Sequence, residues 1–531
     1  MSTFSPAFME TQRRILWVDD EIDLLRPHII LLEQRGYRVS TCSNGTDAIE
    51  LVRREAFGLV FLDESMVGMS GLEVLEMLKG IDPSLPVVMV TKNEQESLMD
   101  EAIGRKIDDY LTKPVNPAQI LAACKKFLES RRISEQKFTQ DYFKGFNELS
   151  ARLMNRVSWD DWVDIYQKLV QWSIDLDRHP DLGFHQTLSD QWQECNRLFS
   201  KYVSDEYAGW LNDKPAEGMP LLSPHVFDEV VLPRLRRGRR TVVFVIDCMR
   251  LDQWLMMEEF IRPLFSVSKS FYSSILPTAT PYARNAIFSG LFPADLAKHY
   301  PAWAPQDSDS EHSQNAYEKE LLEAYVKRRF VNLESPLQYV KIIDTDFGKR
   351  IENDLHRIVK APLTAIVVNA VDMIAHSRSD HAILREIAPD ESAYRSLTGS
   401  WFQHSSFFGM LKTLSAMKDV DVVVTTDHGS IRCMHGVKVL GDRDTSTNLR
   451  YKLGRNVKAD ERHAMIVKSP ESLRLPKTSV TQNMIIAKED YYFVYPTDYH
   501  HYLNKYKDGF QHGGISMEEM ILPVVILEPK S

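Results

Sequence analysis

Four short apolar runs near the N-terminus constrain the fold of this chain more than any other feature. They are ILWV from Ile15, GLVFL from Gly58, PVVMV from Pro86 and DDYLT from Asp108, and amphipathic stretches such as SGLEVLEMLKG separate them. Such alternation is typical of βα units on a parallel sheet. Because the runs do not alternate internally, we expect strands that are covered on both faces.

A polar side chain follows each of these runs. Asp19 and Asp20 follow the first run, Asp63 the second, Thr91 the third and Lys113 the fourth. Ligands of open parallel sheets bind at the carboxyl ends of the strands, so these side chains should lie together. Three carboxylates at one edge favour Mg²⁺. With Mg²⁺ and Lys113 neutralising an incoming phosphoryl group, Asp63 would be the residue that accepts it.

The joint order DD, D, T and KP resembles the receiver domain of bacterial response regulators. That resemblance implies a flavodoxin-like fold with Asp63 as the phosphorylation site. Thr91 would sense the phosphoryl group by a hydrogen bond, and Tyr110 would repack with it. The MP dipeptide usual after the phosphoacceptor stands here as Met66 and Val67, which should not alter the chemistry.

The length of 531 residues predicts two to four domains. We expect a receiver at 12–132, a helical bundle at 133–229 and an α/β domain at 230–531. The middle region lacks strand signals and carries aromatic residues at helical spacing, as in WDDWVDIYQKLVQWSIDL. An aromatic stripe of this kind favours a core or a domain interface over a ligand site.

Three apolar runs in the last region also end in acids. TVVFVI, TAIVVNAV and VDVVVTT precede Asp247, Asp372 and Asp427, and histidines lie nearby. The six candidate metal ligands are Asp247, Asp372, His376, Asp427, His428 and His512. Mixed carboxylate and imidazole ligands suit Zn²⁺ or Mn²⁺. Because six ligands exceed the needs of one catalytic ion, we predict two ions that bridge a substrate oxygen.

The segment ILPTATPYARNAIFSG contains the candidate nucleophile. Pro281 fits the first helical position, which predicts Thr280 as the N-cap. The N-terminus of a helix favours an anion, so a Thr280 hydroxyl activated by a metal would attack phosphorus there. Arg284, four residues on, would bind the phosphate. Thr278 is the competing hydroxyl, and simple helix capping is the competing role for Thr280.

The seven residues comprising Thr280 and the six ligands resemble the site of the alkaline phosphatase superfamily, and the domain resembles its PglZ group. The resemblance implies one Zn²⁺ held by Asp247, Asp427, His428 and Thr280. It implies a second Zn²⁺ held by Asp372, His376 and His512. Sulfatases of that superfamily carry a cysteine-derived nucleophile, whereas threonine points to phosphoryl esters and particularly to diesters. Phosphomonoesters or sulfate esters are the lesser alternatives.

The chain as a whole resembles PorX-like response regulators of type IX secretion and gliding motility. This implies a cognate sensor histidine kinase and a phosphodiesterase acting on linear and cyclic oligonucleotides. It also implies control of gene expression through a sigma factor. Phosphorylation of Asp63 would reposition the helical bundle or drive homodimerisation. The alternative is a non-catalytic regulator whose metals serve folding and which docks on a sigma factor or a secretion component.

Composition limits the remaining classes. A formal net charge of −10 argues against a generally basic nucleic-acid coat. The five cysteines show no pairing pattern, and there is no export signal or apolar run long enough to span a membrane. We therefore expect a cytoplasmic protein. The C-terminus has no recognisable helix-turn-helix, so direct DNA binding is not the expected output.

Overall fold

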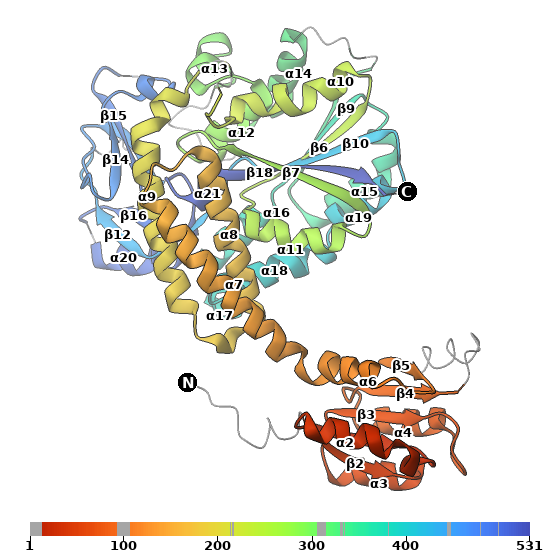
Figure 1. Ribbon diagram of the computed structural model, residues 1–531. Coiled ribbons are helices and arrows are strands. Elements are labelled where there is room, and N and C mark those ends of the chain that lie inside the picture. The colour runs from red at the N-terminus through yellow and green to blue at the C-terminus, as the bar shows by residue number, and fades with distance from the viewer. Residues whose placement is uncertain are drawn as a thin grey trace. The chain divides into compact units, whose positions relative to one another are not determined.

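The computed structural model forms two compact units, which are described separately (Figure 1). One unit comprises 1–148 and 181–183, and the other comprises 149–180 and 184–531. The structure describes residues 13–92, 107–212, 214, 217–304, 315–329, 333, 335–380, 382–442, 446, 448–477, 479–497 and 499–530. Among the residues within these ranges, no helix combines the length and the apolar character that a membrane crossing needs.

The smaller unit contains a five-stranded parallel sheet in the order β2-β1-β3-β4-β5. The strands are β1 (Arg14–Val18), β2 (Arg38–Cys42), β3 (Leu59–Asp63), β4 (Val87–Thr91) and β5 (Asp109–Thr112). This is the strand order of flavodoxin-like folds, whose ligands bind where the order reverses beside the first strand. The predicted α/β sheet and its four apolar strands are therefore confirmed.

Helices cover both faces of this sheet. Leu16 and Leu62 pack into one core cluster, while their neighbours Trp17 and Phe61 pack into another on the opposite face. Ser70 and Glu73 form a capping box that starts one of these helices. The helical segments are η1 (Ile22–Leu25), α2 (Arg26–Gln34), α3 (Gly45–Arg54), α4 (Gly71–Ile81), α6 (Pro117–Cys124), the π-helical turn η2 (Lys125–Glu129) and α7 (Ser130–Leu153), which continues into the residues of the larger unit.

The larger unit is built on a six-stranded sheet in the order β7-β18-β10-β6-β9-β8. Strands β10, β6, β9 and β8 are parallel, and β18 runs antiparallel to both of its neighbours. The strands are β6 (Arg240–Ile246), β7 (Phe265–Ser273), β8 (Gln338–Ile342), β9 (Leu363–Val368), β10 (Val420–Thr425) and β18 (Ile521–Pro529). The carboxyl ends of β6, β9 and β10 therefore meet at one edge.

Helices lie on both faces of this sheet as well (Figure 1). Val243 and Val245 of β6 pack into a core cluster with Phe288 and Tyr325 on one face, while Phe244 contacts Phe407 at 4.9 Å between ring centroids on the other. The helices are η4 (Ser223–His225), η5 (Phe227–Val231), α10 (Leu232–Arg236), α11 (Leu251–Ile261), α12 (Thr280–Ser289), α13 (Pro293–His299), α14 (Glu318–Arg328), α15 (Thr345–Ile358), α16 (Ala370–Asp380), α17 (Ala382–Ile387), α18 (Glu391–Gln403) and α19 (Ser406–Ser415).

Smaller sheets and helices complete this domain beyond β10. The strands pair as β11 with β17, β12 with β16, and β13-β15-β14. Their bounds are β11 (Ile431–Cys433), β12 (His435–Lys438), β13 (Tyr451–Arg455), β14 (Ala464–Val467), β15 (Gln482–Ala487), β16 (Tyr491–Val494) and β17 (Gly509–Gln511), with η7 (Pro470–Leu473), α20 (Tyr499–Tyr506) and α21 (Met517–Met520) between or after them.

Two long helices precede the domain. They are α8 (Trp159–Arg178) and α9 (His185–Trp210), joined through η3 (Pro180–Leu182). Their aromatic side chains face each other, since the rings of Trp162 and Phe199 lie 5.4 Å apart and both side chains are buried. The predicted helical region is confirmed, and its aromatic stripe is core.

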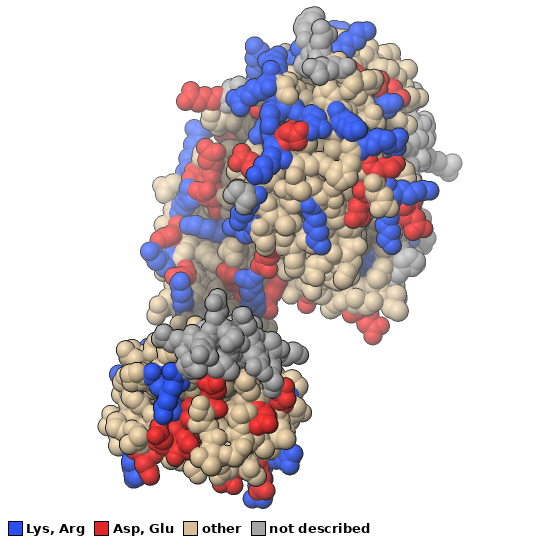
Figure 2. All heavy atoms as spheres, turned by 90° about the vertical axis from the view of Figure 1, so that its right-hand side faces the viewer, with Lys and Arg blue, Asp and Glu red and all other residues tan. Residues whose placement is uncertain are grey.

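Charged side chains of both signs are interspersed on the face of the larger unit that Figure 2 shows. At the start of β6, Arg239 pairs with Asp421 at 2.8 Å and Arg240 pairs with Asp419. These arginines lie at the opposite end of β6 from Asp247. These two arginines therefore form ion pairs at the start of the strand.

Candidate functional site

The receiver edge brings together the predicted acids and the predicted lysine. Asp19 follows β1, Asp63 ends β3, and a ligand oxygen from each of Asp19, Asp20 and Asp63 lies within 4.8 Å of the others. Lys113 Nζ lies 2.8 Å from Asp19 Oδ2 and 3.0 Å from Asp63 Oδ1. An oxygen-only cluster of this kind fits Mg²⁺.

Burial and charge set the titration of this cluster. Burial raises the pKa of Asp63, and the neighbouring Asp19 adds to that rise, while Lys113 opposes it. Burial would lower the pKa of Lys113, but Asp19 and Asp63 outweigh burial and raise it. Lys113 therefore stays protonated and supplies a fixed positive charge beside Asp63.

Thr91 and Tyr110 lie on the two strands beyond Asp63. Thr91 ends β4, and its hydroxyl donates to the Glu64 carboxylate. Tyr110 on β5 is 42% exposed. Their switch roles remain predictions. The sequence did not single out Glu64 as a partner of Thr91. Its position directly after Asp63 was the one signal that could have identified it.

One group in the larger unit comprises Asp247, Asp427 and His428, all of which are buried. Asp247 follows β6, and the other two follow β10. His428 Nε2 lies 3.9 Å from Asp247 Oδ1 and 3.7 Å from Asp427 Oδ2. The chain turns sharply after Asp247, where Cys248 has a φ of 65° and its N–H donates to Asp427 Oδ1 at 3.3 Å. This turn joins the ends of the two strands.

A second group comprises Asp372, His376 and His512. Asp372 and His376 lie one turn apart on α16, with 3.3 Å between His376 Nε2 and Asp372 Oδ1. His512, just beyond β17, lies 3.9 Å from the same oxygen. The rings of His428 and His512 stack with centroids 4.2 Å apart. The two groups are therefore adjacent and divide as the resemblance implied.

The buried carboxylates in these groups fit divalent cations. Asp247 Oδ1, Asp372 Oδ1 and Asp427 Oδ2 are buried and accept no hydrogen bond from the part of the chain that the structure describes. Burial and the neighbouring Asp247 raise the pKa of Asp427. Burial would also raise the pKa of Asp372, but His376, His512 and His428 lower it below its usual range. Buried carboxylate oxygens that accept no hydrogen bond are favourable positions for a divalent cation.

Thr280 lies beside the first group. Its Oγ1 is 2.9 Å from His428 Nε2. The helix α12 begins at Thr280, with Ala279 as the N-cap and no side-chain cap hydrogen bond. The predicted cap position was therefore wrong by one residue, because Pro281 occupies the second helical position. The Thr280 hydroxyl therefore contacts His428 instead of capping the helix.

Thr278 makes different contacts. Its Oγ1 donates to the Gly514 carbonyl at 2.8 Å and accepts from the Gly513 N–H at 3.1 Å. Both glycines directly follow His512. Thr278 therefore fastens the loop that carries a candidate ligand, and of the two competing hydroxyls it is Thr280 that contacts the site.

Arg284 lies inside the site but is occupied by acids. The side chain is 2% exposed, with Nη1 2.6 Å from Asp247 Oδ2 and Nε 2.5 Å from Glu318 Oε1. Tyr339 and Lys341 also contact Glu318, the latter at 3.5 Å. In this arrangement Arg284 orients Asp247, and its expected role as a phosphate ligand remains a prediction. Glu318 was missed because it lies far from the ligands in sequence.

A buried ion pair contacts the loop that carries His512. Arg450 Nη2 lies 2.6 Å from Glu519 Oε2, and both side chains are fully buried. Glu519 also accepts from the Gly514 N–H at 2.8 Å. A Cβ on Gly514 would lie 2.3 Å from Arg450 Nη2, so the glycine is needed for this close approach. No sequence motif marked this pair.

Comparisons with known proteins divide the chain into three matched parts. Residues 226–527 match the BREX system PglZ alkaline phosphatase-like domain, 15–125 match the response regulator receiver domain, and 132–211 match the PorX response regulator linker domain. The expected domain boundaries at 12–132, 133–229 and 230–531 remain predictions.

Two curated proteins are similar to about a quarter of this chain. The alginate biosynthesis transcriptional regulatory protein AlgB of Pseudomonas syringae pv. tomato is 39% identical over 128 residues, which are 24% of this chain and 29% of that protein. The phosphoglycerate transport system transcriptional regulatory protein PgtA of Salmonella typhimurium is 30% identical over 147 residues, which are 27% of this chain and 34% of that protein. The chain thus spans about a third of the length of these relatives. The crystal structure of a CheY-like receiver domain protein from Methanospirillum hungatei JF-1 is 30% identical, covers 22% of this chain and 94% of its own, and has a TM-score of 0.21.

Proposed function

We propose, since the chain belongs to the family of the BREX system PglZ alkaline phosphatase-like domain, that its C-terminal site hydrolyses phosphodiesters under receiver control. The chain is a response regulator with a receiver domain and a PglZ phosphatase-like domain. The receiver implies a cognate histidine kinase, and the PglZ domain suggests a phosphoesterase. Diester specificity and the biological output are the proposal.

The observation that carries the proposal is the position of Thr280. Its hydroxyl lies 2.9 Å from His428 Nε2 at the start of α12. The dipole at such a helix start favours a phosphate anion. Attack by Thr280 Oγ1 on phosphorus would displace the ester oxygen and leave a phosphothreonine ester, which water would then hydrolyse.

Two cation sites fit around this hydroxyl. We assign Asp247, Asp427, His428 and Thr280 to one Zn²⁺, and Asp372, His376 and His512 to the other, because oxygen and imidazole ligands suit zinc. When bound, these ions would lower the pKa of the nucleophile and neutralise charge on the phosphate. Arg284 would hold Asp247 in place through its 2.6 Å contact.

Threonine as the nucleophile supports phosphoryl esters, and the resemblance to PorX-like proteins supports linear and cyclic oligonucleotides as substrates. The test uses zinc-loaded full-length protein with bis(p-nitrophenyl) phosphate and p-nitrophenyl phosphate. We expect faster hydrolysis of the diester and loss of activity after chelation, with recovery when zinc is restored. Faster hydrolysis of the monoester would instead indicate a phosphomonoesterase.

The receiver would control this output. We propose that a sensor histidine kinase phosphorylates Asp63 with Mg²⁺ held by Asp19, Asp20 and Asp63, and that phosphorylation promotes a homodimer. By resemblance, the cytoplasmic output is type IX secretion and gliding, with a sigma factor as a partner. Complementation separates catalysis from docking: if Thr280→Ala restores secretion fully while Asp63→Ala does not, docking is the output.

A further inference from the structure

A cavity of about 400 Å³ lies between the linker helices and the domain that carries the candidate metal ligands. Helices α8 and α9 form one side, and α11, α18, β11 and α21 contribute to the other. A volume of this size is typical of sites for small molecules. No step of the proposed hydrolysis uses this cavity.

Aromatic and aliphatic side chains make up part of its wall. Tyr166 and Trp192 lie edge to face with ring centroids 5.8 Å apart, and Leu188, Val170 and Ile431 extend the apolar surface. Trp192 Nε1 donates to Ser173 Oγ at 3.1 Å, so the indole N–H is satisfied within the protein. This part of the cavity suits the hydrocarbon stem of a ligand.

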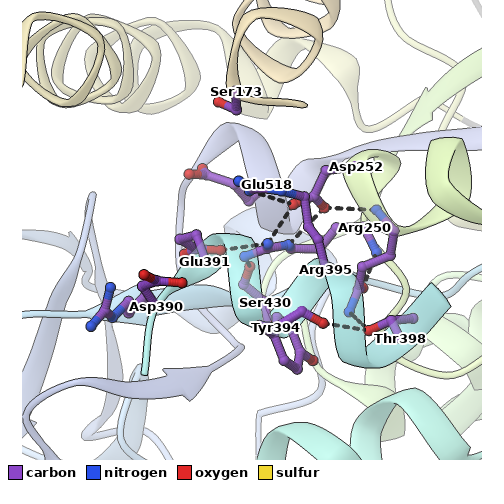
Figure 3. Close-up of polar contacts among 12 residues, drawn as sticks. Ser173, Arg250, Asp252, Asp390, Glu391, Tyr394, Arg395, Thr398, Ser430 and Glu518 are labelled. Atoms are coloured by element: carbon purple, nitrogen blue, oxygen red, sulfur yellow. Dashed lines mark hydrogen bonds and ion pairs between the residues drawn. The ribbon is translucent and has the colours of Figure 1, made fainter. Parts of the chain in front are cut away.

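The two buried arginines of the cavity are already neutralised. Arg250 Nη2 lies 2.5 Å from Asp252 Oδ2 and 2.6 Å from Glu391 Oε2, as Figure 3 shows.

Arg395 has a similar set of partners. It contacts Asp177 at 2.8 Å and Asp252 at 3.3 Å. Three carboxylates thus surround two guanidinium groups, so an anionic ligand would find no free cation at these arginines.

Two further carboxylates, those of Glu518 and Glu489, line the cavity. Glu518 accepts from Asn196 Nδ2 at 2.9 Å, and no described Lys, Arg or His forms an ion pair with Glu518 or Glu489. Burial raises the pKa of Glu518 to about 7 and also raises the pKa of Glu489. A cation placed against these acids would compensate the cost of burying their charges.

We propose that this cavity binds a small organic cation, a protonated amine or guanidinium on a short apolar stem. The charged head forms an ion pair with Glu518, and the stem packs against Trp192 and Tyr166. The face of Trp192 adds a cation–π contribution.

The proposed site adjoins the segments that hold the metal ligands. Arg250 comes three residues after Asp247, and its Nη1 reaches the Ser430 carbonyl two residues after His428. A Cβ on Gly429 would lie 2.0 Å from the Glu518 carbonyl, so these segments pack tightly. The hydrogen bond between Asn196 and Glu518 already connects α9 to this wall, and a cation bound at Glu518 would lie against it.

Isothermal titration calorimetry of the full-length protein tests the proposal. The probes are agmatine and n-butylamine, with neutral butyramide and inorganic phosphate as controls, at pH 8, which lies above the raised pKa of Glu518 of about 7. We expect saturable submillimolar binding of the two cations only. Glu518→Gln should weaken binding by about tenfold, the ratio that about 1.4 kcal/mol produces. The matched variant Glu528→Gln removes an exposed charge and should bind as the wild type does.

Three results would overturn the proposal. They are equal binding of butyramide, an unchanged affinity in Glu518→Gln, and an equal loss in Glu528→Gln, which would mean general charge attraction. Thermal melts show whether Glu518→Gln is folded, and if it is not, Glu489→Gln at the same cavity replaces it. Binding does not require hydrolysis, so failure of either proposal leaves the other testable.

Discussion

The receiver edge and the C-terminal edge both gather acids at the ends of parallel strands, but they handle charge differently. In the receiver, Lys113 lies 2.8 and 3.0 Å from Asp19 and Asp63 and supplies the positive charge itself. In the C-terminal site, Arg284 is shared between Asp247 and Glu318, and histidines join the acids. The first arrangement suits an aspartate that accepts a phosphoryl group, and the second suits a hydroxyl beside tightly held metals.

The largest effect is expected on phosphoryl labelling of the receiver edge. Asp63→Asn should abolish labelling by acetyl phosphate, because the carboxylate that forms the acyl phosphate is gone. Asp23→Asn removes an exposed acid nearby in sequence and should label normally. Phosphoprotein electrophoresis measures both, and persistent labelling of Asp63→Asn would mean that another residue accepts the phosphoryl group.

Replacing a candidate metal ligand of the C-terminal site should lower the zinc content of the protein. Asp427→Asn should reduce bound zinc and slow diester hydrolysis by at least about a hundredfold, because even residues behind metal ligands reach that size of effect. Mass-spectrometric metal analysis and a diester assay provide the readouts. The exposed Asp354→Asn is the matched control. Full zinc content in Asp427→Asn would contradict the ligand assignment.

The support of the His512 loop predicts a stability effect. Arg450→Met leaves Glu519 buried without its partner and should lower the free energy of unfolding by about 3–5 kcal/mol. Arg462→Met breaks an exposed pair with Asp460 and should leave the free energy of unfolding almost unchanged. Urea denaturation measures both. Similar losses in the two variants would show that the buried pair has no special role.

The smallest effect is expected at Thr278. Thr278→Val removes two hydrogen bonds to the His512 loop and should lower kcat about fivefold, the ratio that about 1 kcal/mol produces. The exposed Thr345→Ala should leave kcat unchanged. Complete loss of hydrolysis in Thr278→Val, with zinc retained, would favour Thr278 as the nucleophile.

The sequence predicted the strands and the acids at their ends because both depend on local patterns. An apolar run followed by Asp63 or Asp247 indicates where a strand ends. Within each sheet, parallel pairing then brings the carboxyl ends of neighbouring strands together. The grouping of Asp372, His376 and His512 came from the resemblance to a known superfamily alone, and their role as metal ligands remains a prediction.

Other contacts could not be predicted because they depend on packing between distant segments. The hydrogen bond from Thr91 to Glu64 and the ion pair of Arg284 with Glu318 have no spacing rule. The N-cap of α12 is Ala279, and Thr280 contacts His428, which lies far from it in sequence. Rules for helix ends do not include such contacts.

The measurement that tests the central claim most directly is the zinc content and diester hydrolysis of Thr280→Ala beside the wild type. We predict a folded protein that retains zinc through Asp247, Asp427 and His428, together with the second group, and that hydrolyses bis(p-nitrophenyl) phosphate at least about a thousandfold more slowly. Wild-type hydrolysis by zinc-loaded Thr280→Ala would contradict the account.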